Sequence, residues 1–188
     1  MFVERVALNA VPAYARIAAS VLSSVLGQLA NGSSALRNEL DAGFRELENR
    51  QPCLAEFMAG EVAQLPNAGV QGLAYFLTVL VFRAFEESFG VRVSVVQLAD
   101  VTHMLARLAA DGELRAGGAA GGSYSEDAIA VGQPALVGLL RREVDRAVAE
   151  DPQAPWEALD TFYESLLVMV LVLTHAVEPQ AAADAWRG

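Results

Sequence analysis

The sequence VQGLAYFLTVLVFRAFEESF, at positions 70–89, decides the fold class. Up to its acidic end, its only polar side chains are those of Gln71, Thr78 and Arg83. A second run, at 166–177, is almost as apolar. A helix that is hydrophobic on nearly every side is surrounded by other helices or by lipid. The apolar part of the first run, at 70–85, and the second run are both shorter than the about 20 apolar residues that span a bilayer, and charged residues bound them. We therefore predict two central helices of a soluble bundle, with no stable membrane span.

The rest of the chain shows apolar residues at helical spacing, which predicts amphipathic helices packed around these two. Only 91–96 alternates like a strand, and a single strand would have no partner, so we interpret Ser94 as the N-cap of a helix with Gln97 at its third position. In that helix we expect Val95, Leu98, Val101, Leu105 and Leu108 to face inward. The predicted fold is an all-α bundle of seven or eight helices, at about 12–30, 33–49, 52–65, 70–89, 94–110, 134–150 and 156–177, with a last short turn at 180–188.

We expect 1–188 to form a single helical domain, since this length is near that of one typical domain. The run Gly-Gly-Ala-Ala-Gly-Gly lies between the fifth and sixth predicted helices. Glycine leaves little side-chain surface for packing and costs the most entropy to order. The sequence therefore predicts a flexible loop at about 112–133.

Two similar segments raise the alternative of an internal duplication. Gln51-Pro52-Cys53-Leu54 and Gln133-Pro134-Ala135-Leu136 both open predicted helices, and each of these helices precedes one of the two apolar helices. At the same offset, Glu61-Val62 matches Glu143-Val144. Because proline is common in a first helical turn, these matches leave the duplication open.

Charge and composition exclude several classes of function. The net charge is −10, and the 13 basic residues are all arginine. A chain without lysine has no Schiff-base lysine and no P-loop lysine. Acidity also argues against nucleic acid and anionic membranes as partners. The absence of lysine suggests a GC-rich bacterial genome, and a lone Cys53 with no signal-peptide pattern at the N-terminus suggests a cytoplasmic protein.

The candidate site residues are few. Asp100 and His103 share one helix face, and His175 and Glu178 have similar spacing, but the second pair runs in reverse order relative to the Glu-x-x-His pairs of di-iron bundles. We therefore predict no metal, no cofactor and no catalytic residue. The residues that we select as candidate ligand contacts in the bundle are Arg83, His103 and Tyr75.

The absence of a catalytic motif favours a non-enzymatic helical module that binds another protein or itself, and that has an interaction or regulatory role. Enzymatic activity stays open. One alternative is a sensor or enzyme with an apolar small-molecule pocket inside the bundle, bounded by Arg83 or His103. A further alternative is a pore-forming protein that inserts its apolar helices into a membrane after rearrangement.

Overall fold

The computed structural model describes residues 11–30, 33–116, 129–153 and 155–180. Within these ranges the regular elements are all helices, and the only β-type pairing is an isolated antiparallel bridge between Val93 and Val177. The prediction of an all-α bundle with two central apolar helices is confirmed. The α-helices are α1 (Ala19–Ala30), α2 (Ser33–Arg50), α3 (Pro52–Ala63), α4 (Ala68–Phe89), α5 (Leu98–Ala116), α7 (Pro134–Glu150) and α8 (Ala158–Ala176), and the short 3₁₀ helices are η1 (Ala13–Ala15) and η2 (Gly90–Arg92).

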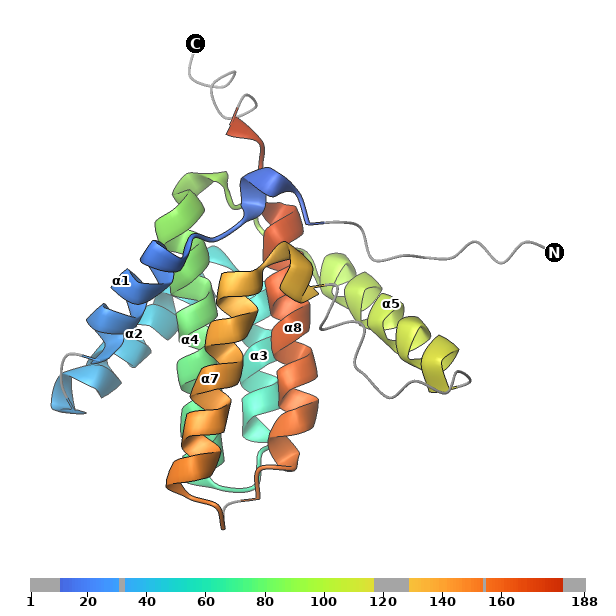
Figure 1. The fold of residues 1–188 in the computed structure, drawn as a ribbon. Helices are drawn as coiled ribbons and strands as arrows, with labels where there is room; N and C mark the ends of the chain where they lie inside the picture. The colour runs from blue at the N-terminus through green and yellow to red at the C-terminus, as the bar shows by residue number, and fades with distance from the viewer. Residues whose placement is uncertain (1–10, 31–32, 117–128, 154, 181–188) are drawn as a thin grey trace.

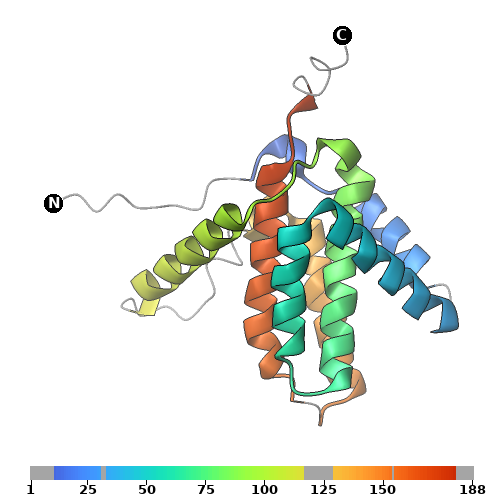
Figure 2. The same cartoon turned by 180° about the vertical axis from the view of Figure 1, so that it is seen from behind.

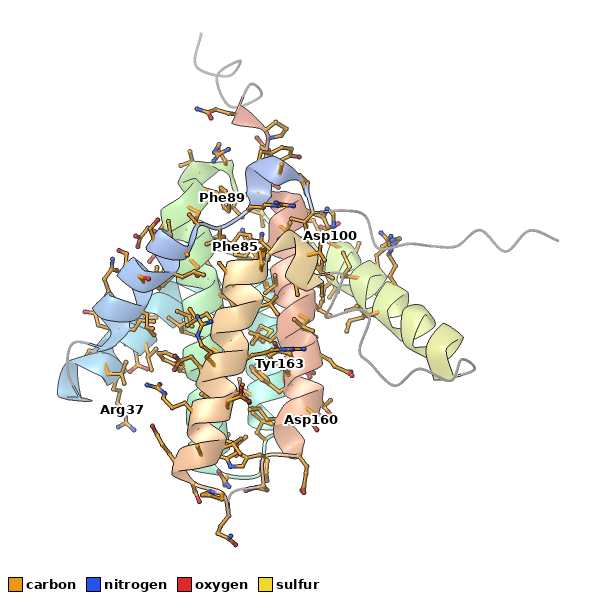
Figure 3. All side chains as sticks on the ribbon, in the orientation of Figure 1. Arg37, Phe85, Phe89, Asp100, Asp160 and Tyr163 are labelled. Atoms are coloured by element: carbon orange, nitrogen blue, oxygen red, sulfur yellow. The ribbon has the colours of Figure 1, made fainter. Side chains whose placement is uncertain are left out.

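Four helices stand side by side in the centre of the molecule: α3, α4, α7 and α8 (Figure 1). The apolar helices α4 and α8 pack directly against each other and supply about half of the buried side chains of the described residues. Phe85 and Phe89 of α4 make a tilted ring contact with 5.8 Å between centroids, near one end of the bundle (Figure 3). The central helices thus bury the surface that the sequence marks as most hydrophobic.

Both apolar helices have the length and composition of a membrane-crossing helix, over 68–92 and 158–176. In the folded chain, 56% and 67% of their most apolar windows are buried. The core helices of soluble proteins have the same character. The absence of a stable membrane span stays a prediction.

The outer helices slope away from this centre on two sides. Helices α1 and α2 leave on one side and α5 leaves on the other, as the views from the front and from behind both show (Figures 1 and 2). Helix α1 packs against α4, and α5 packs against α8 in the same way. Helix α2 also packs against α4, so α4 carries two of the sloping helices and α8 carries one.

The helices α1 and α5 both begin later than the sequence predicts. The prediction of a helix from residue 12 was wrong, because η1 is followed by extended backbone and α1 begins at Ala19. The prediction that Ser94 caps a helix was also wrong. Residues 93–97 are not helical, α5 begins at Leu98, and the Asp100 carboxylate accepts a hydrogen bond from the Gln97 N–H at 2.8 Å.

Two buried glutamines cause these late starts. The side chain of Gln133 accepts a hydrogen bond from the Ile17 N–H (3.0 Å) and donates one to the Ala15 carbonyl (2.6 Å). In the same manner, Gln51 accepts a hydrogen bond from the Val96 N–H (2.8 Å) and donates one to the Ser94 carbonyl (3.0 Å). Backbone groups paired in this way are satisfied in an extended conformation.

The two Gln-Pro segments also match in their own backbones. Gln51 precedes α3 with φ −139° and ψ 61°, and Gln133 precedes α7 with φ −128° and ψ 56°. Each is followed by a proline in the first helical turn. The repeat in the sequence thus corresponds to matching geometry, with each amide bound to the extended residues before α1 or α5.

Part of the predicted loop at 112–133 is helical. Helix α5 continues through Ala116, and residues 129–132 are also helical, so the prediction of a loop was wrong for these residues. Residues 117–128 and the predicted turn at 181–188 lie outside the described residues. Helix α5 also differs in its buried face. Val101 and Met104 point inward, whereas Val95, Leu98 and Leu105 are exposed, contrary to the prediction.

Candidate functional site

A cleft between α5 and α8 brings together the only two histidines of the chain. It has a volume of about 410 Å³. Because Asp100, His103 and Arg107 follow one another at intervals of three and four residues, they share one face of α5. His175 faces them from the last turn of α8. The residues that line this α5–α8 cleft are Ser94, Val95, Val96, Asp100, His103, Met104, Arg107, Val172, His175 and Ala176.

Two polar side chains of the α5–α8 cleft already make hydrogen bonds within the protein. The Asp100 carboxylate is engaged by the Gln97 N–H, and the Ser94 hydroxyl donates to the Ala176 carbonyl at 3.0 Å. Burial lowers the pKa of His175, and the positive charge of Arg107 lowers it further. The imidazole of His175 is therefore biased toward its neutral form, which offers one donor and one acceptor.

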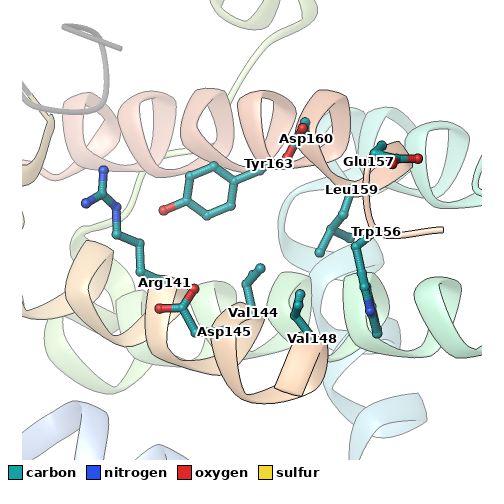
Figure 4. A pocket seen from close by; sticks show the side chains of 9 residues that line it. All are labelled: Arg141, Val144, Asp145, Val148, Trp156, Glu157, Leu159, Asp160 and Tyr163. Atoms are coloured by element: carbon teal, nitrogen blue, oxygen red, sulfur yellow. The ribbon is translucent and has the colours of Figure 1, made fainter. Parts of the chain in front are cut away.

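A second pocket, of about 360 Å³, lies between α7 and the first half of α8. Figure 4 shows the Tyr163 ring extending across it toward Arg141, with Trp156 at the opposite end. The Trp156 indole N–H donates to the Asp151 carbonyl at 2.6 Å, which fixes the ring. The remaining residues that line the pocket are Val144, Asp145, Val148, Glu157, Leu159 and Asp160. With three carboxylates to one guanidinium, this pocket disfavours anions.

Tyr75 lines a third, more apolar groove of about 560 Å³ where α2, α3 and α4 meet. Its ring stacks on Phe44, with 4.8 Å between centroids and 19° between planes. Burial raises the pKa of Tyr75, and the negative charges of Asp41 and Glu48 raise it further. Its ring thus packs against Phe44 beside the core, while its hydroxyl stays protonated at neutral pH.

Arg83 lies in neither the α5–α8 cleft nor the Tyr75 groove. Its guanidinium pairs with the Glu46 carboxylate at 2.6 Å, and both side chains are about one-third exposed. This ion pair joins α4 to α2 near the surface. Of the three candidate ligand contacts, His103 lines the α5–α8 cleft, Tyr75 lines the groove beside α2, and Arg83 lines neither.

Metal-ligand spacing in the sequence does not produce a metal site among the described residues. No group of three or more histidine, cysteine or carboxylate side chains is placed to hold an ion in that part of the chain. Asp100 and His103 face the same cleft as His175, but Glu178 does not line it. Sequence reasoning missed Arg107, although its spacing from His103 places it on the same helix face.

Exposed apolar side chains concentrate on one segment. In the described part of the chain, seven large hydrophobic residues are exposed, and four of them lie between 91 and 105. These four are Val91 (75% exposed), Val95 (53%), Leu98 (65%) and Leu105 (39%), and we call them the apolar ridge. Leu98 and Leu105 are two helical turns apart and so share one flank of α5, whereas His103 and Arg107 lie on another flank, at the cleft.

Comparisons with known proteins add no functional information. No protein-family model, no curated protein and no solved structure matches this chain. The geometry and chemistry of the described residues are therefore the basis for a functional proposal.

Proposed function

We propose that this chain is a non-enzymatic helical interaction module that binds a protein partner, either another protein or a second copy of itself, through the apolar ridge. The observation that carries the proposal is the exposure of Val91, Val95, Leu98 and Leu105 on one short segment. Single exposed apolar residues are common, but clustered ones are typical of interaction surfaces.

The packing of α5 supports this proposal. Helix α5 uses Val101 and Met104 to pack against the bundle, and the same helix offers Leu98 and Leu105 on a second flank. A helix with a single apolar stripe would need only the first set to fold. Leu98 and Leu105 therefore stay exposed within the described chain, and we expect a partner to cover them.

The net charge of −10 indicates the chemistry of the partner. Polar rims of interfaces are complementary in charge, and like charges across an interface cost affinity. Asp100 lies in the first turn of α5, two residues after Leu98. We expect a partner surface with an apolar centre and a neutral or basic rim.

The test is affinity capture from the native host, with quantitative mass spectrometry and a paired variant. Leu98→Ser/Leu105→Ser removes the α5 part of the ridge without touching a buried residue. Val148→Ser is the control, because Val148 is an exposed apolar residue on α7 (37%). Sedimentation equilibrium of the same proteins detects self-association.

We expect the parent and Val148→Ser to retain the same partner or the same self-association, and the double variant to lose it. Circular dichroism should show equal helicity in all three, since only exposed side chains change. If the double variant binds as the parent does, or if the parent neither captures a partner nor self-associates, the ridge is not an interaction surface.

A further inference from the structure

We propose that the α5–α8 cleft is a binding site for a small organic carboxylate with an apolar body. The cleft shares Val95 with the apolar ridge, but its charged side chains lie on a different flank of α5 from Leu98 and Leu105. It rests on the convergence of Arg107, His103 and His175 from two helices onto one cleft of about 410 Å³. A cleft of this size can hold a small molecule, and polar groups supply the larger part of its lining.

The cleft contains both parts that such a ligand requires. Its apolar wall is formed by Val95, Val96, Met104, Val172 and Ala176. A planar guanidinium binds a carboxylate through two parallel hydrogen bonds, and neutral imidazoles can add further donors. The carboxylate would contact Arg107 and the histidines, while the body of the ligand would lie on the apolar wall.

Asp100, the acidic residue of the cleft, does not occupy the same end as Arg107. The two residues are seven apart on α5, which corresponds to about 10 Å along the helix axis. The Asp100 carboxylate is also held by the Gln97 N–H. An anion at the Arg107 end is therefore well separated from Asp100.

Electrostatics explain why an anion would be favoured there in an acidic protein. Among the described residues, the titratable and charged groups that line the cleft are Asp100, His103 and Arg107 on α5 and His175 on α8. The positive charge of Arg107 lowers the pKa of His175 and so disfavours its protonation. A bound carboxylate reverses this effect, so binding is coupled to proton uptake and strengthens as the pH falls.

The experiment uses benzoate as the probe and benzamide as a neutral molecule of nearly the same shape. The chain has two histidines, so its imidazole C–H proton signals can be assigned with His103→Gln and His175→Gln. We expect benzoate to shift both imidazole signals saturably and to raise the pKa of His175. Affinity should increase between about pH 8 and about pH 6, where histidine titrates. Benzamide should produce no comparable shift.

The variants locate the binding. Arg107→Gln should weaken benzoate binding by about tenfold or more, because a charged hydrogen-bonding partner is lost. Arg142→Gln is the matched control, since Arg142 is exposed on α7 and does not line the cleft. His103→Gln changes an exposed residue, so the variant keeps its fold, and it should weaken binding several-fold while the His175 signal still reports it.

Three outcomes would overturn the proposal. The first is the absence of a saturable shift with benzoate at millimolar concentrations. The second is equal shifts with benzoate and benzamide, which would indicate apolar binding without anion recognition. The third is equal benzoate affinity for the parent, Arg107→Gln and His103→Gln.

Discussion

Replacing Gln133 by methionine should cost the protein a large part of its stability. The side chain of Gln133 is fully buried and bonds the Ile17 N–H and the Ala15 carbonyl, both of which are also buried. Methionine has similar length and volume but cannot replace these bonds. Each backbone group left buried without a partner costs about 1–3 kcal/mol, so the loss should be about 2–6 kcal/mol.

That loss is comparable with the whole stability of a typical domain, about 5–15 kcal/mol. Urea unfolding followed by far-UV circular dichroism measures it. The control is Gln64→Met, because Gln64 is exposed and makes only a 3.4 Å bond to the Gly60 carbonyl. The control should change the free energy of unfolding by less than about 0.5 kcal/mol.

A local measurement separates loss of the bond from general loosening. In Gln133→Met, the Ile17 amide should lose more of its protection against hydrogen exchange than the amides of the central helices lose, because its hydrogen-bond acceptor is gone. If Gln133→Met is as stable as Gln64→Met, or if Ile17 remains protected, the glutamine does not hold the extended segment, and the explanation for the late start of α1 fails.

Three further predictions concern the core, a close helix contact and pH. Leu80→Ala, at a fully buried position of α4, should cost about 2–5 kcal/mol by calorimetry, and a melting temperature equal to that of the parent would contradict the assignment of α4 to the core. Gly43→Ala should destabilise by about 1–3 kcal/mol because its Cβ would lie 2.5 Å from Val79 Cγ1, whereas the Cβ of Gly60→Ala meets nothing within 4 Å and this variant should stabilise by up to about 1 kcal/mol. A change in the free energy of unfolding of the same sign for both variants would refute the close contact. Burial lowers the pKa of His175 in the folded chain, so the unfolded chain takes up a proton first as the pH falls through 6.5, and the free energy of unfolding should decrease there. His175→Gln should lack that part of the pH dependence, and identical pH profiles for the two proteins would show that His175 does not contribute.

The sequence predicts the helices well where their boundaries depend on local signals. Helix α7 occupies 134–150, as predicted, because proline suits its first turn. Helix α4 ends at Phe89, before a glycine with φ 53° that leaves the helical conformation.

Local signals fail where a distant side chain pairs with the backbone. Pro12 predicts the start of a long helix, yet Gln133 holds the residues around Ile17 in extended form from 116 positions away. Glutamine is mostly exposed in folded proteins, so nothing in the sequence marks Gln133 as buried. The same reasoning applies to Gln51 and to the late start of α5.

The candidate site could be predicted only in part. Helical spacing places Asp100, His103 and Arg107 on one face of α5, which the sequence alone indicates. That His175 lies opposite them depends on the packing of α5 on α8, which periodicity does not specify. The exposure of Leu98 and Leu105 has the same origin, because hydrophobic residues on two flanks of a helix do not reveal which flank is buried.

The exchange of glutamine contacts makes the two parts of the chain interdependent. The amide of Gln51 binds a segment that follows α4, and the amide of Gln133 binds a segment that precedes α1. The part with α1 to α4 therefore supplies the glutamine that binds the extended segment before α5. The part with α5 to α8 supplies the glutamine that binds the extended segment before α1. Unfolding either part would release a buried amide in both, so the two should lose structure together. We expect one cooperative transition in which circular dichroism and the exchange of the Ile17 and Val96 amides report the same midpoint, and two separate midpoints would show that the parts fold independently.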